Sequence, residues 1–247
     1  MSTAALSSLN PQQLASEAAV VLHSGRHVIK PSDASSVELY SVFGQGLLPR
    51  AVFMEPPRSH IAMAPGVLEA PLGRLAVAVA QVEELGGLGP QGVMGLYGTL
   101  RTQAQDLATG VKGYLLLTGP GALQAVFHDP VAATRWCLEL MVEVRSLQPG
   151  SALQGVNDSV DVEHGAEVAV EDVPPALEAG SLSVRSGVEL GSIEGSLTFD
   201  GRLCYRGTAY KAAGCLAAHA NWGEVLVSGT LVNAIVGQSQ HKSVLPP

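Results

Sequence analysis

The chain has 247 residues, of which 47% are hydrophobic and 15% charged, and its formal net charge is −8. This length and composition provide one sizeable core and exclude wholesale disorder, which needs low hydrophobicity together with high net charge. No apolar run approaches the ~20 residues of a membrane-spanning helix, and the N-terminus lacks the basic and apolar regions of a signal peptide. The three cysteines have no CxxC spacing and predict reduced thiols in a cytosolic compartment.

The negative charge is concentrated in one stretch. Between Ser146 and Val184 there is no Lys or Arg but there are seven acidic side chains. The fifteen acids elsewhere nearly balance the fourteen basic residues, so no basic face for nucleic acid is expected. This charge pattern predicts a solvated acidic loop over residues 148–181.

The first third of the chain predicts a small N-terminal unit and a linker. Residues 10–23 favour a helix, with Asn10 as a cap, and residues 27–29 and 37–42 have strand-like patterns. Prolines recur from Pro49 to Pro71, which indicates an extended connection. The predicted division is a helix plus hairpin at 1–45, a Pro-rich linker at 46–72 and a main domain at 73–240.

The main domain alternates strand and helix patterns. An almost continuous apolar run at 75–82 is typical of a central strand, and Gly119-Pro120-Gly121 is a strong turn signal between two further strands. The order predicts an α+β fold with helices on one face of the sheet. Strands are expected at 75–82, 112–118, 122–127, 182–190, 198–205 and 224–227, and helices at 90–107, from Asp129-Pro130 to Val144, at 208–220 and at 229–236.

Three segments in this order resemble the class III adenylyl/guanylyl cyclases, particularly their Ala/Gly-rich green-algal forms. Leu75–Leu85 resembles the family's first strand, and Gly113–Phe127 with the following Asp129-Pro-Val-Ala-Ala resembles its central hairpin and next helix. Tyr205–Ser228 resembles its late helix and strand. The resemblance covers about residues 65–237 and implies the ferredoxin-like βαββαβ cyclase fold, an antiparallel-rich sheet with helices packed on it.

The same resemblance implies that the family's catalytic positions are degenerate. Class III cyclases hold two metal ions with two Asp residues; the first aligns with Gln81 and the second with Pro120, or with Gly121 if the turn is shifted by one. The purine-reading position aligns near Leu117. The helix Asn and Arg align with Lys211 and Cys215, where Lys211 is at best a partial substitute.

The phosphate-binding segment is also altered by this alignment. In the family, backbone amides at the start of the first helix meet the triphosphate; here that segment reads Val82-Glu83-Glu84-Leu85, whose carboxylates would repel phosphate if they face the site. We therefore expect no retained catalytic, cofactor-binding or metal-binding residue. Mg²⁺ or Mn²⁺ is expected only if the site is active.

A second resemblance concerns residues 16–42, which are similar to the C-terminal tail of another cyclase domain. Two interpretations are open. Either the chain is a slice of a tandem-cyclase polypeptide, or the N-terminal hairpin completes the sheet of the main domain.

The seven histidines show no metal-ligand spacing. His23 and His27 are four residues apart, but without further ligands a surface or turn role is favoured over zinc.

The preferred hypothesis is a nucleotide-cyclase homology domain in cyclic-nucleotide signalling that lacks catalysis and acts as a dimerisation and regulatory module. Its expected partner is another cyclase-type domain, as a homodimer or heterodimer. One alternative is an active adenylyl/guanylyl cyclase, a phosphorus–oxygen lyase, with a divergent site. Another is a structural protein-interaction domain of a larger assembly. The expected location is cytoplasmic, alone or within a larger membrane-associated or tandem-domain protein.

Overall fold

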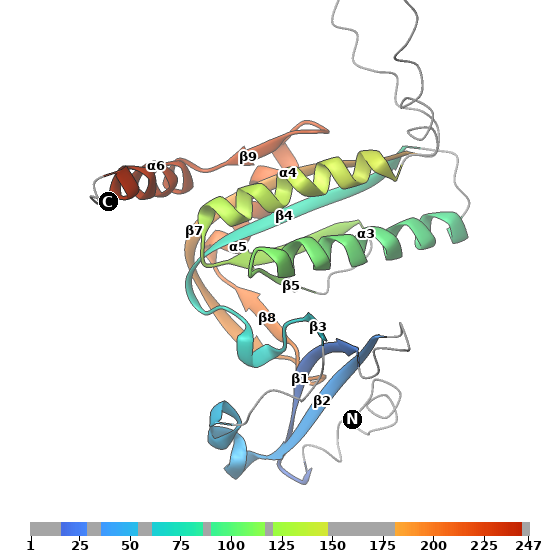
Figure 1. Cartoon of the computed structure of the whole chain (residues 1–247), viewed down its shortest axis with the longest axis vertical. Coiled ribbons are helices and arrows are strands. Elements are labelled where there is room, and N and C mark those ends of the chain that lie inside the picture. Colours follow the sequence, from blue (N-terminus) through green and yellow to red (C-terminus); the bar gives the residue numbers. More distant parts are fainter. Residues whose placement is uncertain are drawn as a thin grey trace, which may run out of the picture.

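The computed structural model describes residues 16–28, 36–53, 61–85, 90–116, 121–147 and 181–243. Strands in these ranges form two sheets, one of three strands and one of six. The three-stranded sheet lies at one end of the molecule, and the six-stranded sheet with its helices forms the larger part (Figure 1). The fold is therefore mixed α+β with antiparallel-rich sheets, as predicted.

The N-terminal sheet has the strand order β2-β1-β3, with antiparallel pairing throughout. Residues 19–23 were predicted as helix, but they begin β1. This prediction is wrong because the consecutive Val20, Val21 and Leu22 pack well on a pleated surface once neighbouring strands are present, whatever the local helix preference. The bounds are β1 Ala19–Val28, β2 Ser36–Gly44 and β3 Ile61–Ala64.

The predicted linker contains regular structure of its own. A 3₁₀ segment, η1 (Gln45–Phe53), follows β2, and η2 (Val67–Glu69) follows β3. Because β3 pairs with β1, part of the segment expected to be a linker belongs to the N-terminal sheet. The interpretation that the hairpin completes the main sheet is wrong, since β1 lies between β2 and β3.

The six-stranded sheet is centred on β4, which pairs antiparallel with β6 on one side and β7 on the other. The order along the sheet is β5-β6-β4-β7-β8, and β9 runs parallel to β7. The strand bounds are β4 Gly73–Leu85, β5 Tyr114–Leu116, β6 Ala122–Phe127, β7 Ser181–Leu197, β8 Leu203–Arg206 and β9 Val225–Val227.

Helices cover both faces of this sheet. On one face α3 (Pro90–Gly110) and α4 (Pro130–Ser146) contact each other, and α6 (Gly229–Ser243) contacts α4 (Figure 1). On the other face lies α5 (Thr208–His219). The expectation of helices on one face only is wrong. The near-continuous apolar run of β4 already implied burial on both sides: Ala76, Ala78 and Ala80 face α3 and α4, while Leu75, Val77 and Val79 face α5. No helix in the described ranges combines the length and apolarity that a membrane crossing requires.

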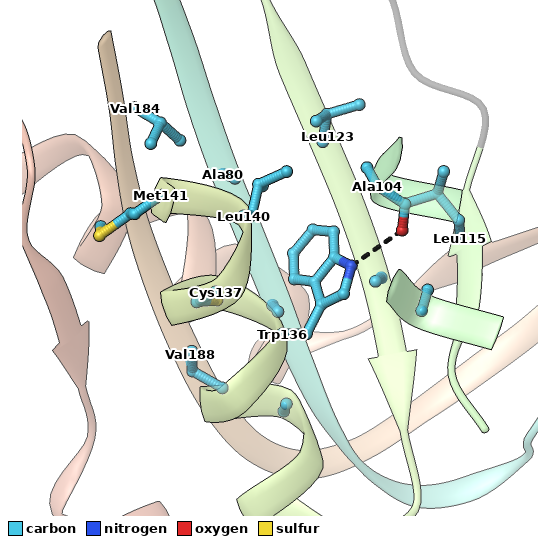
Figure 2. Packing of buried hydrophobic residues seen from close by; sticks show 14 of the residues in the cluster. Ala80, Ala104, Leu115, Leu123, Trp136, Cys137, Leu140, Met141, Val184 and Val188 are labelled. Carbon is cyan, nitrogen blue, oxygen red and sulfur yellow. Dashed lines mark hydrogen bonds between the residues drawn. The ribbon is translucent and has the colours of Figure 1, made fainter. Parts of the chain in front are cut away.

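Trp136 anchors the larger of the two cores. Its side chain is fully buried between α4 and the sheet, and its indole N–H donates to the backbone carbonyl of Ala104 on α3 at 3.0 Å (Figure 2). A buried tryptophan whose single donor is satisfied keeps its apolar contribution at no desolvation cost. The predicted cap of α4 is also confirmed, since the Asp129 carboxylate accepts from the Val131 amide at 3.0 Å.

Candidate functional site

Gln81 lies on the α5 side of β4, in register opposite Arg185 of β7. The Arg185 Nε donates to the Gln81 Oε1 at 3.0 Å. The first aligned metal position is thus joined to a cationic side chain of the same sheet.

Arg185 also reaches the end of α5. Its Nη1 donates to the carbonyls of Ala218 and Ala220, at 3.1 and 3.4 Å, and its guanidinium lies 4.5 Å from the centre of the Trp222 ring. Carbonyls at a helix C-terminus lack intrahelical partners and carry partial negative charge, so a cation is well placed there. The ring face adds a cation–π contact. Arg185 therefore ties β4, the C-terminus of α5 and the following turn together.

This arrangement does not fit a divalent cation. Hard cations such as Mg²⁺ take oxygen ligands, usually carboxylates that compensate their charge. Gln81 is neutral, its oxygen already accepts from Arg185, and the guanidinium would repel a nearby metal ion. In the described ranges, His, Cys, Asp and Glu side chains nowhere gather in groups of three that could hold a metal ion.

Lys211 and Cys215 lie on the outer surface of α5. The helix buries Ala209, Ala213 and Ala217 against the sheet, whereas Lys211 and Cys215 are exposed. No hydrogen bond joins either side chain to Gln81 within the described residues. Gln81 thus lies on the sheet face that α5 covers, whereas Lys211 and Cys215 lie on the exposed side of α5. The other two aligned positions, Leu117 and Pro120, lie outside the described residues.

The segment Val82–Leu85 is a strand and not the start of a helix. It continues β4, paired in register with residues 181–184 of β7, and α3 begins only at Pro90. The expectation that these residues form a phosphate-binding helix start is wrong, because the long partner strand β7 extends the ladder to the end of β4. The Val82 carbonyl also accepts from the Tyr97 hydroxyl of α3 at 3.0 Å.

A second feature is a cavity of about 230 Å³ between the N-terminal sheet and α3. His23 lines it and is only 4% exposed, and neither ring nitrogen has a hydrogen-bond partner among the described residues. Burial, and secondarily the positive charge of Arg202, lowers the pKa of His23 to about 4. The predicted surface role of His23 and His27 is wrong: both are buried, and the His27 Nε2 lies 2.7 Å from the Ser24 carbonyl oxygen.

The turn between β7 and β8 fixes the N-terminal sheet beside this cavity. The His23 amide donates to the Gly201 carbonyl at 2.8 Å, and Arg202 pairs with Glu38 and donates to the Tyr40 hydroxyl at 3.0 Å. Gly201 has φ of +78°, and a Cβ there would lie 2.6 Å from the Val21 carbonyl oxygen. Only glycine allows this close approach of the two backbones.

Sequence reasoning missed Arg185 and Arg202, and it favoured a surface or turn role for His23. For Arg185 a signal was present, since it is the single basic residue inside the apolar strand pattern at 182–190. Its partner could not be read from the sequence, because the register between β4 and β7 joins residues more than a hundred positions apart.

No protein-family model matches this chain, and no curated protein sequence matches it. Solved structures do. The guanylyl cyclase domain of the RhoGC fusion protein from the aquatic fungus Blastocladiella emersonii matches with a TM-score of 0.51 at 12% identity, over 67% of this chain and 86% of that chain. The guanylate cyclase domain of RhGC from Catenaria anguillulae, solved in complex with GTP, matches with a TM-score of 0.51 at 13% identity, over 67% and 83%.

A bacterial structure agrees. The adenylyl cyclase CyaB from P. aeruginosa matches with a TM-score of 0.50 at 16% identity, over 67% of this chain and 81% of that chain. Identities this low establish the fold alone. This chain has the fold of adenylyl and guanylyl cyclase catalytic domains.

Proposed function

We propose that this chain is a nucleotide-cyclase homology domain that does not turn over nucleotide and instead serves as a dimerisation and regulatory module in cytoplasmic cyclic-nucleotide signalling. The observation that carries the proposal is the Arg185 guanidinium bonded to Gln81. A cyclase needs anionic ligands for its metal ions, and this chain offers a neutral amide whose oxygen is already engaged.

The remaining aligned positions support the same conclusion. Cys215 stands where the resemblance places an arginine that stabilises charge on the phosphates, and its thiol is a poor substitute for a guanidinium. Lys211 is cationic and exposed one turn away. Neither half of a site shared between two subunits is supplied, so pairing with a second copy would not restore turnover.

The exposed side of α5 supports dimerisation with a second domain. In the family that the sequence resembles, the active site forms at a dimer interface, to which the helix equivalent to α5 contributes an Asn and an Arg. Here Lys211 and Cys215 lie on that exposed side. A dimeric crystal structure of the RhoGC guanylyl cyclase domain, described as non-canonical, matches this chain with a TM-score of 0.51. We infer that another cyclase-type domain, the same or different, covers this side of α5.

The catalytic half of the proposal is tested by assaying the purified chain with ATP or GTP and Mn²⁺ or Mg²⁺. We expect cyclic-nucleotide formation at the level of the protein-free blank, while an active cyclase domain in parallel confirms the assay. Product above the blank that falls in both Gln81→Ala and Lys211→Ala would show instead a divergent active cyclase.

The pairing half is tested by sedimentation over a concentration series, alone and with a co-expressed cyclase domain. We expect association that Lys211→Glu weakens and that Lys112→Glu, an exposed lysine after α3, leaves unchanged. A chain that stays monomeric under both conditions would contradict the dimerisation role.

A further inference from the structure

The cavity between the N-terminal sheet and α3 combines positive side chains with buried polar atoms that lack partners. Its lining comes from both parts of the fold: β1 and β2 on one side, and α3, β5 and the approach to β8 on the other. The charged side chains in the lining are Arg26, Glu38, Arg101 and Arg202, and the histidine His23 lies among them.

The three arginines differ in how far they are paired. The Arg26 Nη2 lies 3.5 Å from the Asp106 Oδ1. Arg202 is paired with Glu38, and its Nε lies 3.6 Å from the Asp200 Oδ2. Arg101 forms no hydrogen bond or ion pair with any residue that the structure describes. The carboxylates therefore neutralise two of the arginines, whereas Arg101 is exposed at the cavity and is paired with no carboxylate of the described residues.

Buried donors and acceptors point to the same place. Both ring nitrogens of His23 and the Nε of Arg26 are buried without a hydrogen-bond partner in the part of the chain that the structure describes. A buried polar group left unsatisfied costs free energy comparable to a lost hydrogen bond, and native proteins retain few of them. Two such groups lie on β1, and both line the same cavity as Arg101. A ligand that hydrogen-bonds to them would explain why the fold retains them.

We propose that this cavity binds a small oxyanion, a phosphate or carboxylate group, held by Arg101 and Arg26 with His23 as a further donor. Arginine suits this chemistry because its planar fork matches both kinds of oxyanion. The ligand would bridge the two parts of the fold, since His23 and Arg26 belong to β1 and Arg101 to α3. The proposal is independent of whether the domain is catalytic.

Ligand binding would also change the titration of His23. The charged and titratable groups around its ring are Arg202, Glu38, Asp200, His27 and Tyr40. Arg202 lowers the pKa of His23, and a bound anion would act in the opposite direction. A neutral donor in the free protein would thus become easier to protonate in the complex.

The test is isothermal titration of the full chain with inorganic phosphate and, separately, with succinate, each against sodium chloride of matched ionic strength. We expect saturable binding of at least one of the two, and the preferred anion identifies the source as phosphate or carboxylate. Arg101→Ala should weaken binding at least about tenfold, because a charge-assisted contact is removed while alanine preserves the helix. Arg206→Ala, which removes an exposed arginine of β8 outside the cavity lining, should leave it unchanged.

A second readout separates binding from a structural effect. In the protein with labelled histidines, the His23 ring resonances should shift on phosphate or succinate addition in the wild type and in Arg206→Ala, and far less in Arg101→Ala. The proposal is overturned if neither anion saturates, or if Arg206→Ala weakens binding as much as Arg101→Ala does.

Discussion

Two regions of this molecule place an arginine near another polar side chain, and they differ in how completely the chain satisfies the hydrogen bonds of these side chains. At the cyclase-type position, Arg185 is bonded to the Gln81 amide and two backbone carbonyls and lies against an aromatic ring. At the inter-sheet cavity, Arg101 has no partner in the described part of the chain and the His23 ring nitrogens are unbonded.

The difference bears on what each region can bind. Side chains whose bonds are all made within the chain gain little from a ligand, because each new contact must replace an existing one. The His23 ring nitrogens, which are buried and unbonded within the described residues, gain the full value of a new partner, whereas the exposed Arg101 exchanges water for it. The region that resembles a catalytic site is therefore closed by its own chain, and the region with no counterpart in that resemblance is the open one.

The largest expected effect is a loss of stability at low pH, caused by the buried His23 at the inter-sheet cavity. The folded-state pKa of His23 is about 4, below the ordinary 6.5. Between these values the unfolded chain binds a proton that the folded chain does not, so stability falls as pH decreases from 6.5 towards 4. Protonation of His23 therefore lowers the free energy of unfolding by roughly 3 kcal/mol. Urea unfolding at pH 7 and at pH 4.5 measures it.

The matched variant is His23→Phe, which keeps an aromatic ring beside Tyr40 and has no group that titrates. Carboxylates protonate in the same range in both proteins, so the difference between their pH profiles isolates the histidine. Parallel profiles would show that protonation of His23 does not oppose folding.

A smaller effect is expected where the two parts of the fold touch. Gly201 and Gly73 both have positive φ, of +78° and +99°, but a Cβ at Gly201 would meet the Val21 carbonyl and one at Gly73 would meet nothing within 4 Å. Alanine at either position carries backbone strain of about 1–2 kcal/mol. Gly201→Ala should cost about 2 kcal/mol more than Gly73→Ala in chemical unfolding, because only there must the N-terminal sheet move. Equal costs would mean that the sheet is not held against this turn.

Much of the fold could be read from local patterns. The β6 and α4 segments follow directly from an apolar run after Gly121 and from the Asp129-Pro130 cap. The failures lie where distant partners decide the outcome. Residues 19–23 have the composition of a helix or a strand, and pairing with β2 selects the strand.

The candidate site shows the same limit. The chemistry of Gln81, Lys211 and Cys215 predicts from the sequence alone that they do not replace the aligned catalytic residues, and this stays a prediction. That Gln81 has acquired Arg185 as a partner depends on the β4–β7 register, and that His23 is buried depends on the β7–β8 turn reaching the N-terminal sheet. Neither contact leaves a local signature in the sequence.

The smallest expected effect tests how strongly the hydrogen bond between Arg185 and Gln81 contributes to stability. Arg185→Ala removes the bonds to Gln81 and to the end of α5 and should destabilise the chain by about 1–2 kcal/mol. Gln81→Ala should cost less, because Arg185 keeps its two carbonyl partners and the Trp222 ring.

A double-mutant cycle should give a coupling of about 0.5–1 kcal/mol between the two side chains. Cys215→Ser, on the exposed face of α5, serves as the control and should change stability by less than about 0.5 kcal/mol. A coupling near zero would mean that Gln81 is free to accept another ligand, and the contrast between the closed and open regions would then be lost.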